Sequence, residues 1–290
     1  PPPEARSSLN ERLFNLSGSG RNLQWSAAWD AYTERPWLGS GAGTYELDWL
    51  ARRDVAGKVR DAHNLYLETL DELGPAGLAL LLGFLAVPLL AAVAARREPF
   101  VPIAFGAFVA FALHAGVDWD WELPAITVAG LVAAGAIVIA QRPEGQHVER
   151  RAGRFRVAVS VLALAVGMLA FVGLLGNRAL AESRAAGLAG QWERSADRAR
   201  SAARFAPWAA EPWRRVALSQ PTAARARPYF LKAIARAKRN WQLWLELAWA
   251  SRGADQRRAL AEASRLNPLS PEIADYRARL AAKRKTARTP

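Results

Sequence analysis

Histidine is rare in this sequence, and one of its three copies, His63, stands where it could take part in catalysis. His63 is followed by Asn64 near the start of a helical pattern, just before the first long apolar segment. An imidazole titrates near neutral pH and is therefore a competent general base for a hydroxyl group. A lone histidine is more often structural, so the residue by itself leaves both roles open.

Arg21 is the second residue whose type and position could do chemistry, because it begins a predicted amphipathic helix. Apolar residues follow at the spacing of one helical face, from Trp25 to Tyr32, and Pro36 ends the pattern. The free N–H groups and the dipole of a helix N-terminus favour an anion near Arg21. Beyond this helix, three residues are interpreted as turn glycines, with phosphate contact as the alternative: Gly39, Gly41 and Gly43.

The helix that would position His63 has recognisable ends. Asp61 is a good N-cap, and the helical pattern runs to Leu73. Gly74 fits the C-terminal end of this helix, and Pro75 fits the first position of the next one. The sequence therefore predicts that His63 lies on the first turn of a capped helix, just outside a membrane.

The apolar segments predict an all-α chain with four membrane-spanning helices. The first segment has no charged residue over about 21 positions, enough to cross a hydrocarbon core of about 30 Å. By the positive-inside rule, the basic loops after the first and third spans are cytoplasmic, so the His63 segment and the tail face outward. The four predicted spans cover about residues 75–95, 99–117, 123–140 and 157–176.

The loop between the second and third spans is acidic and aromatic, with Trp119 and Trp121 between its three carboxylates. The pair Asp118 and Asp120 resembles the metal-binding pair of soluble glycosyltransferases. Interleaved tryptophans at a membrane boundary are more typical of an interfacial aromatic belt, so no metal site is predicted. The loop faces outward and is a candidate wall of the active cleft. His114 and His147 are predicted not to be catalytic; His147 would lie on the cytoplasmic side.

Charge divides the chain into two unlike parts. Residues 1–176 carry 15 Lys and Arg against 17 Asp and Glu, whereas residues 177–290 carry 24 against 9. A basic excess of this size indicates contact with phosphate, acidic glycan or anionic lipid headgroups, without distinguishing among them. The absence of cysteine excludes disulfides, thiol catalysis and cysteine-based metal sites.

The tail is predicted to be helical throughout. Its alanine-rich amphipathic runs are broken near residues 205–208, 239–241 and 266–269. Breaks about 33 and 28 residues apart approximate the tetratricopeptide period of 34 residues. We therefore expect a soluble helical-repeat domain of the tetratricopeptide (TPR) type, with an irregular helical bundle as the alternative.

Two motifs together resemble the O-antigen ligase and O-antigen polymerase family of membrane glycosyltransferases. The first is Gly20-Arg21 with Trp25, followed by Pro36-Trp37-Leu38-Gly39. The second is the run from Ala62 through His63 to Glu68, with Glu72-Leu73-Gly74 after it. The resemblance covers about residues 18–140 and leaves the tail outside. Family members have about ten or more spans and the chain opens Pro-Pro-Pro, so we expect the C-terminal portion of a longer protein.

The resemblance implies a reaction and a role for particular residues. A glycan would move from a polyprenyl diphosphate carrier to an acceptor hydroxyl on a glycan, a lipid or a protein, with inversion at the anomeric carbon. His63 would accept the hydroxyl proton and Arg21 would hold the diphosphate. Arg60, Asn64 and Asp118 are candidate substrate-binding residues, with a solvated charge as the alternative for Arg60. No cofactor, metal or nucleic-acid partner is expected.

The sequence thus predicts an extracytoplasmic catalytic loop (1–73), a membrane region (74–176) and an extracytoplasmic TPR-like domain (177–290) that recruits a protein partner. The localisation expected is a multi-pass protein of the plasma membrane. One alternative function is a membrane-anchored interaction protein whose working part is the tail. A secondary transporter is the less favoured alternative, because the four predicted spans contain no Asp, Glu, Lys or Arg.

Overall fold

The computed structural model describes residues 20–141 and 151–286, which are helical with no strand. His147, predicted not to be catalytic, and most of the basic loop predicted to be cytoplasmic lie outside the described residues. The chain divides into two compact units, residues 1–146 and 147–290. Unit 1 contains α2 (Arg21–Glu34), α3 (Tyr45–Arg52), α4 (Leu65–Ala94), α5 (Val101–His114), the 3-10 turn η2 (Asp120–Glu122) and α6 (Pro124–Ala140).

Helix α4 is two helices joined at a kink, as Gly74 and Pro75 predict. Gly74 has φ 66° and ψ −170°, a conformation that favours glycine. Proline has no N–H, so Pro75 cannot donate to the carbonyl of Asp71 four residues earlier. The N–H of Ser40, in the α2–α3 loop, donates to that carbonyl instead at 2.8 Å. The kink is therefore completed by a backbone contact from a distant loop.

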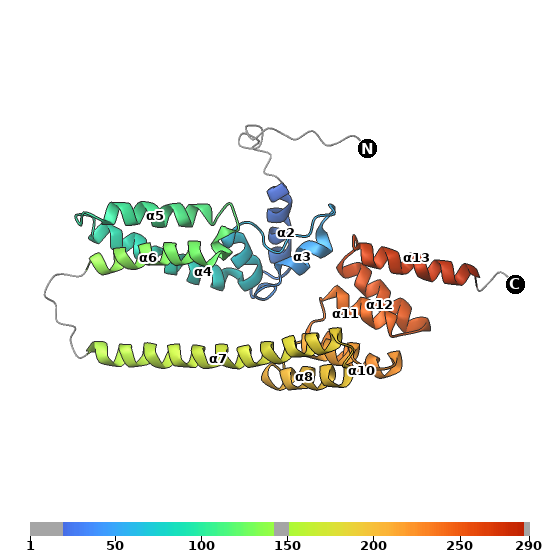
Figure 1. Ribbon diagram of the computed structural model, residues 1–290. Coiled ribbons are helices and arrows are strands. Elements are labelled where there is room, and N and C mark those ends of the chain that lie inside the picture. The colour runs from blue at the N-terminus through green and yellow to red at the C-terminus, as the bar shows by residue number, and fades with distance from the viewer. Residues whose placement is uncertain (1–19, 142–150, 287–290) are drawn as a thin grey trace. The chain divides into compact units, whose positions relative to one another are not determined.

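The apolar part of unit 1 is formed by α4 beyond the kink together with α5 and α6, which lie side by side in Figure 1. Their common core includes Leu85, Phe108 and Ile137, each at least nine-tenths buried. Gly130 allows α6 to approach α5 closely, because a Cβ there would lie 2.8 Å from the ring of Phe111. These contacts join the three apolar helices into one packed group.

Two helices in the described part of the chain are long and apolar enough to cross a membrane, Leu65–Ala94 and Phe155–Leu188. They contain the first and fourth predicted spans. Helices α5 and α6 have 14 and 17 residues, or about 21 and 26 Å at 1.5 Å per residue. These lengths fall short of a hydrocarbon core of about 30 Å, so the second and third spans stay a prediction.

Unit 2 begins with one continuous helix, α7 (Arg151–Leu188), so the predicted boundary at residue 176 falls inside a helix. Helix α8 packs along the C-terminal part of α7 (Figure 1). Long helices then alternate with shorter ones as far as the final helix. The remaining helices are α8 (Trp192–Phe205), α9 (Glu211–Leu218), α10 (Ala223–Arg236), α11 (Trp241–Trp249), α12 (Gly253–Leu266) and α13 (Pro271–Thr286).

The three predicted breaks in the tail coincide with the turns that follow α8, α10 and α12. These helices start at Trp192, Ala223 and Gly253, which are 31 and 30 residues apart. The helical pairing is as expected, whereas the TPR type stays a prediction. A buried cluster that includes Phe230, Ile234 and Leu243 joins α9 to α12.

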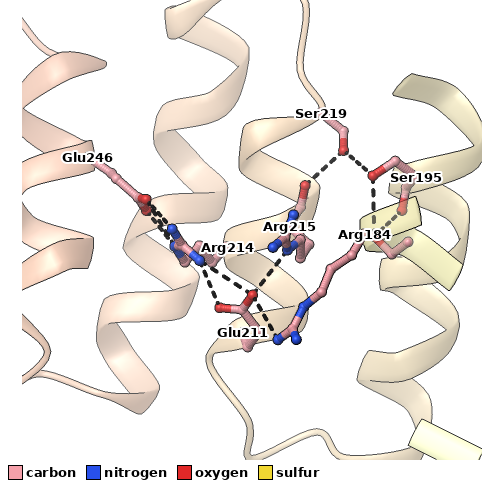
Figure 2. Close-up of polar contacts among 8 residues, drawn as sticks. Arg184, Ser195, Glu211, Arg214, Arg215, Ser219 and Glu246 are labelled. Carbon is pink, nitrogen blue, oxygen red and sulfur yellow. Dashed lines mark hydrogen bonds and ion pairs between the residues drawn. The ribbon is translucent and has the colours of Figure 1, made fainter. Parts of the chain in front are cut away.

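Two polar networks link these helices to one another (Figure 2). Ser183 on α7 donates to the main-chain oxygen of Ser195 on α8 at 2.8 Å, and Ser219 donates to the Ser195 hydroxyl at 2.9 Å. Arg214 on α9 reaches both carboxylate oxygens of Glu246 on α11, with Nη2 2.6 Å from Oε1. The Glu246 side chain is only 8% exposed, so its charge depends on this one guanidinium.

Removal of Arg214 should therefore destabilise unit 2 far more than removal of an exposed arginine. We expect Arg214→Ala to lower the free energy of unfolding by about 3–5 kcal/mol, because a buried carboxylate loses its partner. The matched control is Arg227→Ala, which breaks the exposed Arg227–Asp255 pair and should cost under about 1 kcal/mol. Urea unfolding of the whole chain in detergent measures both, and equal losses would contradict the proposed role of Glu246.

Candidate functional site

His63 has a strained backbone, and its ring contacts the neighbouring residue Asp61. Its φ is 53°, and it is the one non-glycine residue with positive φ in the described parts of the chain. This conformation costs about 1–2 kcal/mol outside glycine, and such strain often marks functional sites. Nδ1 lies 2.8 Å from Oδ1 of Asp61 and 3.3 Å from the Asp61 main-chain oxygen. Asp61 therefore holds one ring nitrogen, which leaves Nε2 for chemistry.

Asn64, not Asp61, caps the helix that follows. Its side-chain oxygen accepts hydrogen bonds from the N–H groups of Tyr66 and Leu67, each at 3.0 Å. The predicted cap at Asp61 and the position of His63 inside the helix are therefore wrong, because the Asp61 carboxylate contacts the imidazole and α4 starts at Leu65. Asn64 was expected to bind substrate, and with its oxygen in the cap only its amide NH₂ group remains for a ligand.

Arg21 and Asp118 are 97 residues apart in sequence, and their side chains are in contact. Arg21 begins α2, as predicted, and its Nη2 lies 2.8 Å from Oδ2 of Asp118. The other oxygen of Asp118 accepts a hydrogen bond from the N–H of Trp119. Two residues predicted separately for the same site thus form an ion pair. About a third of the Arg21 side chain is exposed, so the guanidinium can reach a ligand.

Contacts between α4 and the end of α5 bring the Asp118–Glu122 loop to the His63 segment. The N–H of Leu65 donates to the carbonyl of Ala115 at 2.8 Å, and the Tyr66 hydroxyl donates to the carbonyl of Ala112 at 2.6 Å. These bonds place the first turn of α4 against the last turn of α5. The loop that follows α5 is therefore close to His63, as the sequence predicts.

Arg60 and Glu122 extend this group of charges. Burial raises the pKa of Glu122, and the negative charge of Asp61 raises it further, whereas the positive charges of Arg60 and His63 act in the opposite direction. Arg60 is exposed, so solvation remains open for it beside phosphate contact. The structure thus gathers Arg60, Asp61, His63 and Glu122 into one electrostatic neighbourhood. Sequence reasoning missed Asp61 and Glu122 as members of it.

Two buried carboxylates, Glu68 and Asp71, lie on the part of α4 that precedes Gly74. Glu68 accepts a hydrogen bond from the N–H of Ala62 at 2.7 Å, and burial raises the pKa of Glu68 to about 8. Burial likewise raises the pKa of Asp71 to about 7, and Ser40 donates to its carboxylate at 3.2 Å. Both lie outside the uncharged segment that starts at Pro75. Their burial could not be predicted from the sequence, because acidic residues outside a span are ordinarily solvated.

The raised pKa of Glu68 predicts that unit 1 loses stability as the pH rises. Between its ordinary value of 4.5 and about 8, the folded protein retains a proton that the unfolded chain releases, so a rise in pH favours unfolding. We expect the thermal midpoint to be higher at pH 5 than at pH 8. Glu68→Gln keeps an oxygen for the Ala62 N–H and should reduce this difference; an unchanged difference would exclude Glu68 as its source.

The acidic loop directs its carboxylates to different partners. Oδ1 of Asp120 lies 2.9 Å from Nδ1 of His114, whereas Asp118 pairs with Arg21. Among the described residues, no group of three or more His, Asp or Glu side chains is arranged to hold a metal ion. The arrangement supplies a histidine in contact with an aspartate, together with arginines suited to an anion. Such a set can remove a proton from a hydroxyl beside a bound phosphate.

Part of the chain is similar to a known protein family. Residues 4–82 match the family model described as O-antigen ligase. The match covers Arg21, Arg60, His63 and Asn64, and it ends before Asp118 and unit 2. It supports an O-antigen ligase-like, glycosyltransferase-type function in general. O-antigen ligases are membrane-embedded, and the two long apolar helices are compatible with that location. No curated protein and no solved structure matches the chain.

Proposed function

We propose that this chain is part of a membrane glycosyltransferase that transfers or polymerises a glycan from a polyprenyl diphosphate carrier to an acceptor hydroxyl. The observation that carries the proposal is the O-antigen ligase match over residues 4–82, which contains both Arg21 and His63. The contact of His63 with Asp61 and the contact of Arg21 with Asp118 support it independently.

In the proposed reaction, His63 acts as the general base through Nε2, because Nδ1 faces Asp61. The acceptor hydroxyl gives its proton to Nε2 while its oxygen forms a bond to the anomeric carbon. The bond from that carbon to the carrier diphosphate breaks, and its electron pair leaves with the diphosphate. Attack from the face opposite the leaving group inverts the anomeric centre. Asp61 stabilises the imidazolium that forms, as a carboxylate does in catalytic triads.

Arg21 would bind the diphosphate and stabilise the charge that develops on it. Its contact with Asp118 uses Nη2 and leaves Nη1 and Nε to face phosphate oxygens. The first N–H groups of α2, the helix that Arg21 begins, are not capped by a side chain and also favour an anion. Arg60 would supply a second cation. A lipid diphosphate leaves as a stable anion, so positive charge is needed more than a proton donor.

The proposed location is the plasma membrane, crossed several times, with residues 1–73 and 177–290 on its outer side. Unit 2 would then recruit a protein partner or the acceptor. The second candidate function, a membrane-anchored interaction protein, is favoured by the helical pairs of unit 2. The two proposals predict different effects of removing Arg21. The glycosyltransferase proposal predicts that glycan transfer is lost and that partner binding is unchanged.

Arg21→Ala should lower glycan transfer by a factor of about 10²–10³, the usual effect of removing one group that stabilises developing negative charge. The assay uses membranes that carry the full-length gene and a lipid-linked glycan donor, with the high-molecular-weight glycoconjugate as the product measured. Arg97→Ala, an exposed arginine in the loop between α4 and α5, is the control and should retain the wild-type rate. Wild-type transfer by Arg21→Ala, at equal expression, would exclude diphosphate binding by this residue.

A further inference from the structure

The loop between α2 and α3 exposes two large apolar side chains. Trp37 is 82% exposed and Leu38 is 87% exposed, the two highest values for large apolar residues in the described part of unit 1. From Pro36 to Thr44 the loop carries no charged residue. Contact of such a pair with water is unfavourable, so its exposure indicates that another apolar surface covers it.

This loop is held rigidly against the kink in α4. Besides Ser40, which bonds to the carbonyl of Asp71, the N–H of Gly41 donates to the carbonyl of Glu72 at 2.9 Å. The backbones also touch, since a Cβ at Gly74 would lie 2.6 Å from the main-chain oxygen of Trp37. Trp37 and Leu38 therefore stay at the level of Gly74 along α4.

At Gly74 the sequence of α4 changes from charged to uncharged residues. Asp71 and Glu72 immediately precede the kink, and the residues from Pro75 to Ala95 are uncharged. If α4 crosses the bilayer, Gly74 lies at the boundary between headgroups and acyl chains. Tryptophan concentrates at this boundary, because its ring is apolar and its N–H is polar. The exposed pair is thus at the depth where a lipid surface would cover it.

We propose that Trp37 and Leu38 insert into the headgroup–acyl boundary of the outer leaflet and hold the segment from α2 to His63 against the membrane. The occupant of this apolar patch is lipid. The inference rests on α4 crossing the membrane, which belongs to the proposed function, but not on any catalytic role. Insertion would hold Arg21 and His63 near headgroup depth, where the diphosphate of a lipid carrier lies.

The test uses single cysteines, since the chain has none of its own. Leu38→Cys carries a nitroxide label in lipid vesicles, and its collision rates with oxygen and with a water-soluble nickel chelate are measured by electron paramagnetic resonance. The aqueous control is Asp54→Cys, an exposed residue after α3, and the membrane control is Phe84→Cys, which is 57% exposed midway along the apolar part of α4. All three sites are exposed, so labelling removes little packing.

We expect the ratio of oxygen to nickel collisions at position 38 to exceed that at position 54 several-fold and to approach that at position 84. A ratio equal to that at position 54 would place the loop in water and overturn the inference. Low collision rates with both reagents would show a protein partner instead, which also overturns it. Access of the nickel chelate to position 84 would show that α4 does not cross the membrane, which overturns both this inference and the location in the proposed function. If position 84 is exposed to lipid and position 38 is not, only the insertion of the loop is rejected.

Discussion

Replacing His63 with alanine is expected to lower glycan transfer by a factor of about 10²–10⁴, the range lost when a positioned general base is removed. Only about a fifth of the imidazole is exposed, and its polar contacts within the described residues are with Asp61 alone. Alanine removes the packing of this ring as well as its base, so transfer is compared at equal expression and insertion. The same membrane assay used for Arg21 measures the effect, with expression and insertion checked in parallel.

Two further variants make this result specific. Asp61→Asn keeps the shape of the side chain but removes the charge that stabilises the imidazolium, so it should lower transfer less than His63→Ala. His114→Ala is the matched histidine control and should transfer at the wild-type rate, although His114 also pairs with an aspartate, Asp120. A full rate from His63→Ala would reject the general-base mechanism, and unit 2 would become the functional centre.

Gly39→Ala is expected to destabilise unit 1 by about 3–5 kcal/mol, the range of severe backbone and steric defects. Gly39 has φ 68°, and an added Cβ would lie 2.4 Å from both the carbonyl carbon and oxygen of Glu72. These are backbone atoms that cannot rotate away. The α2–α3 loop would have to leave the kink, which breaks the hydrogen bonds from Ser40 and Gly41 to α4.

Gly43 provides a closely matched comparison in the same loop. Its φ is 70°, nearly that of Gly39, but an added Cβ would have nothing within 4 Å. Gly43→Ala therefore isolates the cost of the left-handed backbone, about 1–2 kcal/mol. Thermal unfolding and limited proteolysis of both variants in detergent separate the two contributions. Equal losses would show that the contact with the kink adds nothing to stability.

Local chemistry made part of this structure predictable from the sequence. Gly74 and Pro75 predicted the break in α4, because glycine tolerates a positive φ and proline lacks an N–H. The turns in unit 2 were equally visible as interruptions of amphipathic runs. The helices themselves follow from periodicity, so the all-helical architecture needed no knowledge of distant contacts.

Tertiary contacts decided what local chemistry could not. Asp61 is as good an N-cap by type as Asn64, and only the contact with His63 determines which residue caps α4. The pairing of Arg21 with Asp118 joins residues 97 positions apart, and no spacing rule connects them. The depth that we propose for Trp37 depends in the same way on a backbone contact with the kink.

Helix α7 fixes an angular relation within unit 2. It runs unbroken from the apolar segment into the part that packs on α8, where a Cβ at Gly176 would lie 3.3 Å from Cβ of Phe205. An α-helix advances about 100° per residue, so one residue inserted into the apolar segment would turn the helical pairs by about that angle around the axis of α7. The number of residues in α7 therefore sets the direction in which the helical pairs face relative to the apolar segment of the same helix.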